Sequence, residues 1–307
     1  MRIVFMGSPE FALPSLGILL EHQYDVPLVV TVPDKPAGRG RHVASSPVKE
    51  FADRRKIETL QPESLTDPAF LQRLKSLSPD LFVVVAFRIL PKACYEIPSR
   101  GAFNLHASLL PKFRGAAPIN WAIINGERET GVTTFFLQDR VDTGSVILQA
   151  RTTIGPDETA GDLHDRLADI GAEIVLQTVH LIEVGKAKPW RQDDSLASRA
   201  PKIFKEGCRV DWNKTAREVH DFIRGLSPRP CAFSLLDESS FRFYRSRVAS
   251  SGNGGSPGSI CATTTQLLVQ TGSGAIEILE IQQEGKKRMS SEEFLRGYRF
   301  PSTSVFH

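Results

Sequence analysis

The first half of the chain alternates short, almost wholly apolar runs with segments of helical spacing. The apolar runs, rich in Val, Ile, Leu and Phe, are residues 3–6, 27–32, 81–85 and 102–105. The helical segments are residues 10–21 and 68–77. This alternation predicts an α/β fold with a mostly parallel sheet, whose strands are buried on both faces. Ligands bind such sheets beyond the carboxyl ends of the strands, so residues that follow a strand are candidates for a site.

The turn after the first apolar run argues against a dinucleotide cofactor. It holds one glycine, Gly7, followed by Ser8 and Pro9, and the Gly-x-Gly-x-x-Gly pattern is absent. Those glycines let the backbone approach a pyrophosphate closely. We therefore expect a Rossmann-like fold that binds no NAD.

The second half of the chain changes in character. Strand-like runs at 133–136 and 146–150 and a long helix capped by Thr159 precede a polar stretch, 190–207, which suits a linker. Beyond it, short strand-like runs separated by turns favour a small OB-like β-barrel. The predicted parts are a first domain over 1–189, the linker over 190–207 and a smaller barrel domain over 208–307.

Composition narrows the class of protein. With 41% hydrophobic and 24% charged residues, the chain is typical of a globular protein. No apolar run approaches the roughly 18 residues that a membrane helix needs, and no targeting segment is recognised. The four cysteines form no Cys-x-x-Cys pair, so we expect reduced thiols, no disulfide framework and no metal site. These features favour a cytoplasmic protein.

The charge of the chain is unevenly distributed. Residues 201–307 hold 15 Lys and Arg against 11 Asp and Glu, whereas residues 1–200 hold 23 against 24. A basic C-terminal third favours a polyanionic partner, although ordinary domains often carry the same balance.

Three polar side chains form a candidate catalytic set. Asn104 and His106 end the fourth apolar run, and their i, i+2 spacing places both on one face of a strand. Asp142 follows later, before Thr143 and Gly144. An amide, an imidazole and a carboxylate can transfer an acyl group to an amine, because donors stabilise the oxyanion while acid–base groups move the proton. The pattern alone leaves two alternatives open, a hydrogen-bonded structural pair and a turn aspartate.

The residues around this set resemble the signature of the folate-dependent formyltransferases. The matching segments are Asn104-Leu105-His106-Ala107-Ser108-Leu109-Leu110-Pro111, Arg114-Gly115-Ala116-Ala117-Pro118 and Asp142-Thr143-Gly144. The start of the chain, with Gly-Ser-Pro-Glu-Phe-Ala, and the segment 223–228 are similar to the tRNA-acting members of that family. The resemblance implies formyl transfer from 10-formyltetrahydrofolate to methionyl initiator tRNA. It also implies a Rossmann-like formyltransferase domain followed by an OB-like tRNA-binding domain.

The resemblance assigns roles to individual residues. Catalysis is assigned to Asn104, His106 and Asp142. The tetrahydrofolate pocket is implied at Ser108, Leu109, Leu110 and Pro111, with a further wall at Phe87 and Arg88. The segment 86–91 departs from the Ala-Tyr-Gly pattern common in the family, and Ser145 stands where many relatives have an acid.

A basic segment follows the second apolar run and is predicted to be a loop, because Pro and Gly replace any hydrophobic pattern over 33–42. Its cations are Lys35, Arg39 and Arg41, with Lys49 shortly after. Charge alone leaves open a solvated surface loop. The resemblance implies that this loop inserts at the acceptor end of tRNA, with Arg39 as the main contact. In the barrel domain, Lys286, Lys287 and Arg288 are candidate phosphate contacts.

Two rival functions remain from the sequence. One is a sister enzyme that formylates a small amine, such as a UDP-amino-sugar or glycinamide ribonucleotide, with the same catalytic set. The other is a non-catalytic RNA-binding protein built around the barrel. We expect a monomer that binds tetrahydrofolate species and tRNA and contacts no membrane.

Overall fold

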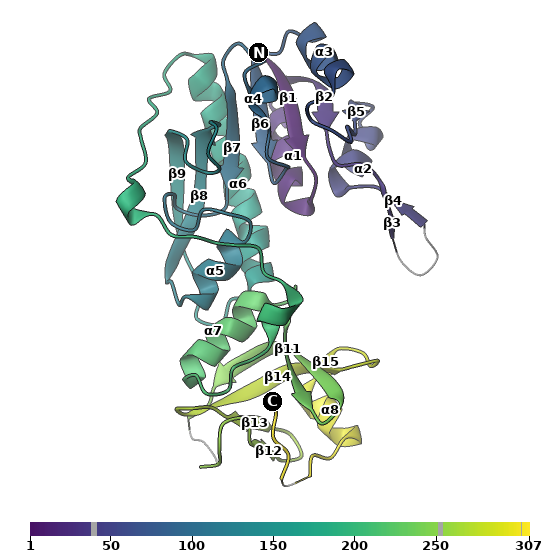
Figure 1. Ribbon diagram of the computed structural model, residues 1–307, viewed down its shortest axis with the longest axis vertical. Coiled ribbons are helices and arrows are strands. Elements are labelled where there is room, and N and C mark those ends of the chain that lie inside the picture. Colours follow the sequence, from purple (N-terminus) through teal and green to yellow (C-terminus); the bar gives the residue numbers. More distant parts are fainter. Residues whose placement is uncertain (38–41, 251–253, 302) are drawn as a thin grey trace. The chain divides into compact units, whose positions relative to one another are not determined.

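The computed structural model describes residues 1–37, 42–250, 254–301 and 303–307, and the chain forms two compact units (Figure 1). The sheet unit comprises Met1–Gly115, Gly131–Thr152 and His164–Arg199, and the half-barrel unit comprises Ala116–Thr130, Thr153–Leu163 and Ala200–His307. The units therefore interleave along the chain. The division into domains at residues 190 and 208 stays a prediction.

The sheet unit is built on a seven-stranded sheet of order β5-β2-β1-β6-β7-β8-β9. Its strands are β1 Arg2–Gly7, β2 Asp25–Val30, β5 Glu58–Leu60, β6 Leu81–Val85, β7 Ala102–His106, β8 Glu129–Phe136 and β9 Val146–Thr153. From β5 to β7 neighbouring strands are parallel, and β8 is antiparallel to β7. The side chains of β6 are all buried, as the continuous apolar run predicts. The mostly parallel sheet is thus confirmed.

The helices of the sequence are η1 Glu10–Ala12, α1 Leu13–Glu21, α2 Pro47–Arg54, α3 Pro68–Ser76, α4 Lys92–Tyr95, α5 Pro118–Ile124, α6 Ala160–Glu183, η2 Asp194–Leu196, η3 Lys205–Cys208, α7 Ala216–Leu226 and α8 Ser291–Gly297. Local capping explains where several of them begin. The Thr159 N–H donates to Asp162 Oδ2 at 3.1 Å, and the Asp162 N–H donates back to Thr159 Oγ1 at 3.2 Å. This reciprocal cap is the one expected from sequence for the long helix.

The basic segment after β2 is a hairpin at its flanks rather than a loop throughout. Strands β3 Lys35–Ala37 and β4 His42–Ala44 pair antiparallel, with Ala37 opposite His42. Antiparallel backbone hydrogen bonds therefore replace the predicted loop on both sides of residues 38–41. Arg39 and Arg41 lie outside the described residues, and so does the side chain of Lys35.

The half-barrel unit contains an antiparallel sheet of order β10-β11-β14-β13-β12, with β15 beside β14. Its strands are β10 Ala232–Leu236, β11 Ser239–Val248, β12 Ile260–Ala262, β13 Leu267–Gln270, β14 Ala275–Gln283 and β15 Met289–Ser290. The end of the chain bonds to both edges of this sheet. His307 exchanges two backbone hydrogen bonds with Leu235, and Ile260 donates to Ser304 at 3.0 Å. The C-terminal residues thus bridge the two edge strands of the half-barrel.

The cysteines are free thiols. Burial raises the pKa of the Cys94 thiol to about 12 and that of Cys231 to about 11. Both are therefore protonated and poorly nucleophilic at neutral pH. Over the described residues, no helix is both long and apolar enough to cross a membrane.

Candidate active site

His106 ends β7 and is buried, with 6% of its surface exposed. Its Nε2 lies 2.8 Å from the carbonyl oxygen of Phe113. A carbonyl oxygen only accepts, so Nε2 must carry the proton in this contact. In the neutral ring Nδ1 is then free to accept a proton. Asp142 Oδ2 lies 3.8 Å from this Nδ1. The structure therefore brings together two members of the predicted catalytic set.

Asp142 is buried and has a left-handed backbone conformation, with φ of +56°. Its Oδ2 accepts a hydrogen bond from the Gly115 N–H at 2.8 Å. The loop that follows β8 directs this carboxylate toward His106. Gly144 in the same loop allows the loop backbone to approach β8 closely. A Cβ at position 144 would lie 1.6 Å from the Phe136 carbonyl oxygen.

Gly144→Ala is expected to destabilise the protein by about 2–4 kcal/mol, because the added methyl group overlaps the backbone of β8. Thermal unfolding of the two proteins measures the change. Gly207→Ala is the matched control, since a Cβ there meets nothing within 4 Å and we expect less than about 0.5 kcal/mol. Equal melting temperatures for Gly144→Ala and the wild type would refute this account of the loop.

Asn104 lies on β7 two residues before His106 and is partly exposed. Its backbone is fixed by pairing opposite Phe135 of β8 and Val84 of β6. Among the described residues, no hydrogen-bond partner is found for the Asn104 side chain. Its amide donors are therefore available to a ligand.

The predicted folate residues form a turn directly after β7. The Ser108 hydroxyl donates to the Lys112 carbonyl at 2.6 Å, so it shapes the turn from within. Thr133 Oγ1 donates to the Ser108 carbonyl at 2.6 Å and accepts from the Leu110 N–H at 3.1 Å. Gln149 Nε2 donates to the Leu110 carbonyl at 2.8 Å. Leu109 and Pro111 are partly exposed, which leaves them as the surfaces that this turn offers to a ligand.

Phe87 and Arg88 follow β6 in a separate loop. The Arg88 guanidinium lies 5.4 Å from the Phe87 ring centre and donates to the carbonyls of Pro62 and Glu63 at 2.6 and 3.0 Å. Arg88 thus connects the loop after β6 to the loop after β5 at the carboxyl edge of the sheet. In the described part of the chain, neither residue shares a hydrogen bond or ring contact with residues 108–111.

The three barrel cations differ in availability. Lys286 and Lys287 are exposed between β14 and β15. Arg288 Nε donates to Glu280 at 2.7 Å, and its guanidinium lies 4.3 Å from the Tyr244 ring centre. The two lysines are therefore freer than Arg288 to bind phosphate.

Two residues that the sequence reasoning missed, Gln192 and Ser198, belong to the candidate site, together with Arg114, which the family signature contains without a role. Gln192 and Ser198 come from the stretch expected to be a linker, and Arg114 comes from the turn after β7. Gln192 is buried and bonds to Asp142, whereas Ser198 bonds to Phe113. The partners in these two contacts are 50 and 85 residues apart in the sequence, so no local sequence pattern indicates the contacts.

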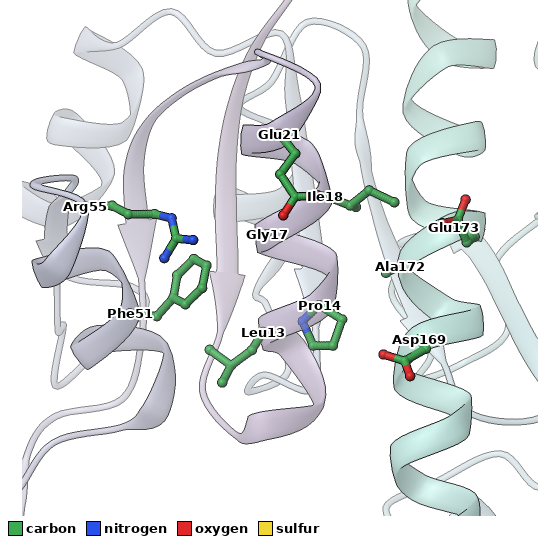
Figure 2. A pocket seen from close by; sticks show the side chains of 10 residues that line it. All are labelled: Leu13, Pro14, Gly17, Ile18, Glu21, Phe51, Arg55, Asp169, Ala172 and Glu173. Carbon is green, nitrogen blue, oxygen red and sulfur yellow. The ribbon is translucent and has the colours of Figure 1, made fainter.

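A shallow groove of about 520 Å³ lies elsewhere on the sheet unit, between α1, α2 and α6 (Figure 2). Its lining residues are Leu13, Pro14, Gly17, Ile18, Glu21, Phe51, Arg55, Asp169, Ala172 and Glu173. The Arg55 guanidinium lies 3.7 Å from the Phe51 ring centre at one side of it. The groove contains none of the predicted site residues. The described residues include no group of three or more His, Cys, Asp or Glu that could hold a metal ion.

Known proteins match the chain over nearly its whole length. The families described as formyl transferase and formyl transferase, C-terminal domain, match residues 1–179 and 202–299. Methionyl-tRNA formyltransferase from Caldanaerobacter subterraneus subsp. tengcongensis is 46% identical over 307 residues, with 99% of each chain covered. The Chlorobium luteolum enzyme of the same name is 48% identical, with 97% of each covered. An N-formyltransferase from Helicobacter canadensis, solved with folinic acid and dTDP-3-aminofucose, superposes with a TM-score of 0.68 at 19% identity, covering 91% of this chain and 98% of that one.

Proposed function

This chain belongs to the formyl transferase family, and we infer that it transfers a formyl group from 10-formyltetrahydrofolate to the α-amino group of methionyl initiator tRNA. The products are N-formylmethionyl-tRNA and tetrahydrofolate, and the reaction serves translation initiation. The observation that carries this conclusion is the identity of 46–48% with methionyl-tRNA formyltransferases across both family domains.

The arrangement around His106 supports a role in moving the proton of the amine. The α-amine must be neutral to attack the formyl carbon, and its ordinary pKa is about 8. Because Nε2 is held by the Phe113 carbonyl, Nδ1 is the ring atom that would accept this proton. The charged ring would then face an acceptor at each nitrogen, Phe113 at one and Asp142 at the other.

Transfer requires one bond to form and one to break. The amine nitrogen bonds to the formyl carbon, and the tetrahedral intermediate carries an oxyanion. The free amide of Asn104 and the protonated Nδ1 of His106 would donate to this oxyanion. Collapse breaks the bond from carbon to N10 of the folate, and the proton taken from the amine ends on N10. Asp142 would stabilise the charged ring or orient a water in the proton path.

A transfer assay with several acceptors tests the proposed function. We expect formylation of charged initiator tRNA to exceed formylation of elongator methionyl-tRNA, and a UDP-amino-sugar to be a poor acceptor. The Helicobacter canadensis neighbour shares the fold alone, so it lends no support to a sugar substrate. Comparable rates with the amino sugar and the tRNA would favour the sister enzyme. Tight tRNA binding without any transfer would favour the non-catalytic RNA-binding protein.

Activity is expected to survive exhaustive chelation and dialysis. The proposed steps use an amide, an imidazole and a carboxylate, and none needs a Lewis acid. Transfer rates before and after treatment with a chelator check this, with a zinc-dependent enzyme as the positive control. Lost activity that returns only with added zinc would reveal a ligand set that the sequence and structure did not indicate.

We propose a cytoplasmic location, because the proposed substrates are a charged tRNA and a reduced folate. The expected monomer stays a prediction, which analytical ultracentrifugation would test.

A further inference from the structure

Residues 190–199, named the strap here, run alongside the candidate active site within the sheet unit. The strap begins with a β-bridge in which Trp190 and Val146 exchange backbone hydrogen bonds of 2.8 and 2.9 Å. It ends where Arg114 pairs with Arg199 in a second bridge. Between these anchors it contacts both loops that flank His106.

Gln192 is the inward-facing residue of the strap, with 6% of its surface exposed. Its Nε2 donates to the carbonyls of Asp142 and Gly144 at 2.9 and 2.8 Å. Its Oε1 accepts from Arg114 Nε and Nη2 at 3.1 and 2.6 Å. A guanidinium only donates and carbonyls only accept, so these partners fix the orientation of the amide.

The strap also holds the carbonyl side of the histidine. The Phe113 N–H donates to Ser198 Oγ at 2.9 Å, and the Arg114 N–H donates to the Ser198 carbonyl at 2.9 Å. Phe113 is the residue whose carbonyl faces His106 Nε2. One short segment therefore fixes both acceptors of the ring, Phe113 through Ser198 and Asp142 through Gln192.

We propose that Gln192 is a positioning residue for formyl transfer, which ties the Asp142 loop to Arg114 and so sets the place of the Asp142 carboxylate against His106. This inference rests on the proposed function of the same site. Asp142 Oδ2 lies 3.8 Å from His106 Nδ1. The Asp142 backbone has a left-handed conformation, which a residue other than glycine keeps only where surrounding contacts hold it. The placement of the carboxylate therefore depends on partners outside its own loop. A displacement of about 1 Å of a catalytic group lowers rates by up to about a hundredfold.

The sharpest test is Gln192→Glu, which replaces the donating nitrogen by an oxygen of the same size. The carboxylate still accepts from Arg114, but it repels the carbonyls of Asp142 and Gly144. We expect kcat to fall about tenfold to a hundredfold, while KM for 10-formyltetrahydrofolate and methionyl-tRNA stays within about twofold. Gln192→Leu removes all four hydrogen bonds and should show the same split between kcat and KM.

Asp194→Ala is the matched control. Asp194 bonds to the same guanidinium at 2.8 Å, but its side chain is 64% exposed and touches neither loop carbonyl. We expect its kcat to stay within about twofold of the wild type, because an exposed ion pair contributes little. A loss as large as that of Gln192→Glu would show that the strap acts by general attachment, and would overturn the specific role of Gln192.

A double-mutant cycle shows whether Gln192 acts through Asp142. In an Asp142→Asn background, Gln192→Glu should lower kcat by less than about twofold further, because the group it positions is already lost. Full additivity of the two effects on kcat would overturn the proposal. So would unchanged kcat in a folded Gln192→Glu protein, or melting of both Gln192 variants below the assay temperature. A wild type without transfer activity would instead refute the proposed function.

Discussion

Replacing His106 by alanine is expected to slow formyl transfer by about a hundredfold or more in a protein that still folds. The substitution removes Nδ1, the ring atom left free by the hydrogen bond from Nε2 to Phe113. It also removes one of the two proposed oxyanion donors. The proton acceptor and the oxyanion donor both stabilise the transition state and not the bound substrates. Folate and tRNA should therefore bind with nearly unchanged affinity. Single-turnover rates and equilibrium binding of both substrates are the measurements.

Three companion variants sharpen this expectation. Asn104→Ala should cause a loss of similar size, since it removes the other oxyanion donor. Asp142→Asn should also slow transfer, because the charged ring loses its counter-ion. His22→Ala is the control, because in the described part of the chain the ring of this exposed histidine bonds only to the Ile18 carbonyl of α1. Near-normal turnover in a folded His106→Ala protein would remove this histidine from the mechanism.

The sequence predicted the buried strands well because each is one continuous apolar run. β6 matches its predicted bounds, 81–85. Shorter elements carried no such signal. α2 is eight residues long and depends on a single cap, in which Ser46 Oγ accepts from the Lys49 N–H at 3.1 Å. β5 has three residues and exists because β2 offers it a paired edge, which is information held elsewhere in the chain.

The residues of the candidate site also fall into those that the sequence predicts and those that it does not. Asn104 and His106 were predictable because they share one strand, and strand geometry places residues i and i+2 on one face. Their link to Asp142 came from the chemistry of an amide, an imidazole and a carboxylate and from a family signature, not from any periodicity. Gln192 was not predictable, because its polar neighbours look like those of any linker and its partners lie 48 to 78 residues away. Burial of one amide among exposed charges is a property of the fold alone.

Lys49 illustrates a further limit of sequence reasoning. It was counted among the cations of the basic segment, yet its Nζ bonds to Asp34 Oδ2 at 2.6 Å. That hydrogen bond lowers the pKa of Asp34, and Gln61 Nε2 bonds to the other carboxylate oxygen at 2.7 Å. The charge of Lys49 is therefore paired with Asp34, the residue directly before β3.

Arg39→Ala is expected to lower formylation of methionyl-tRNA by about a hundredfold, an amount typical of lost substrate positioning. Arg39 lies outside the described residues, within the four residues that join Ala37 to His42. Both flanking strands follow β2 at the carboxyl edge of the sheet, the edge at which β7 ends with His106. One short segment neutralises few phosphates, so its contribution should appear in the rate and less in tRNA affinity. Folate binding should not change, because no residue of the proposed pocket is altered.

The barrel lysines provide the contrasting variant for the same assay. Lys286→Ala combined with Lys287→Ala should weaken tRNA binding and reduce the slope of log affinity against log salt by about one per lost phosphate contact. Arg288→Ala should change that slope less, since Glu280 already neutralises this side chain. Measuring transfer rates and tRNA affinity at two salt concentrations separates placement of the acceptor end from bulk attraction.

If Arg39→Ala leaves formylation untouched, the segment is a solvated surface turn. If it flattens the salt dependence as the barrel variant does, Arg39 acts as one more phosphate contact and positions nothing.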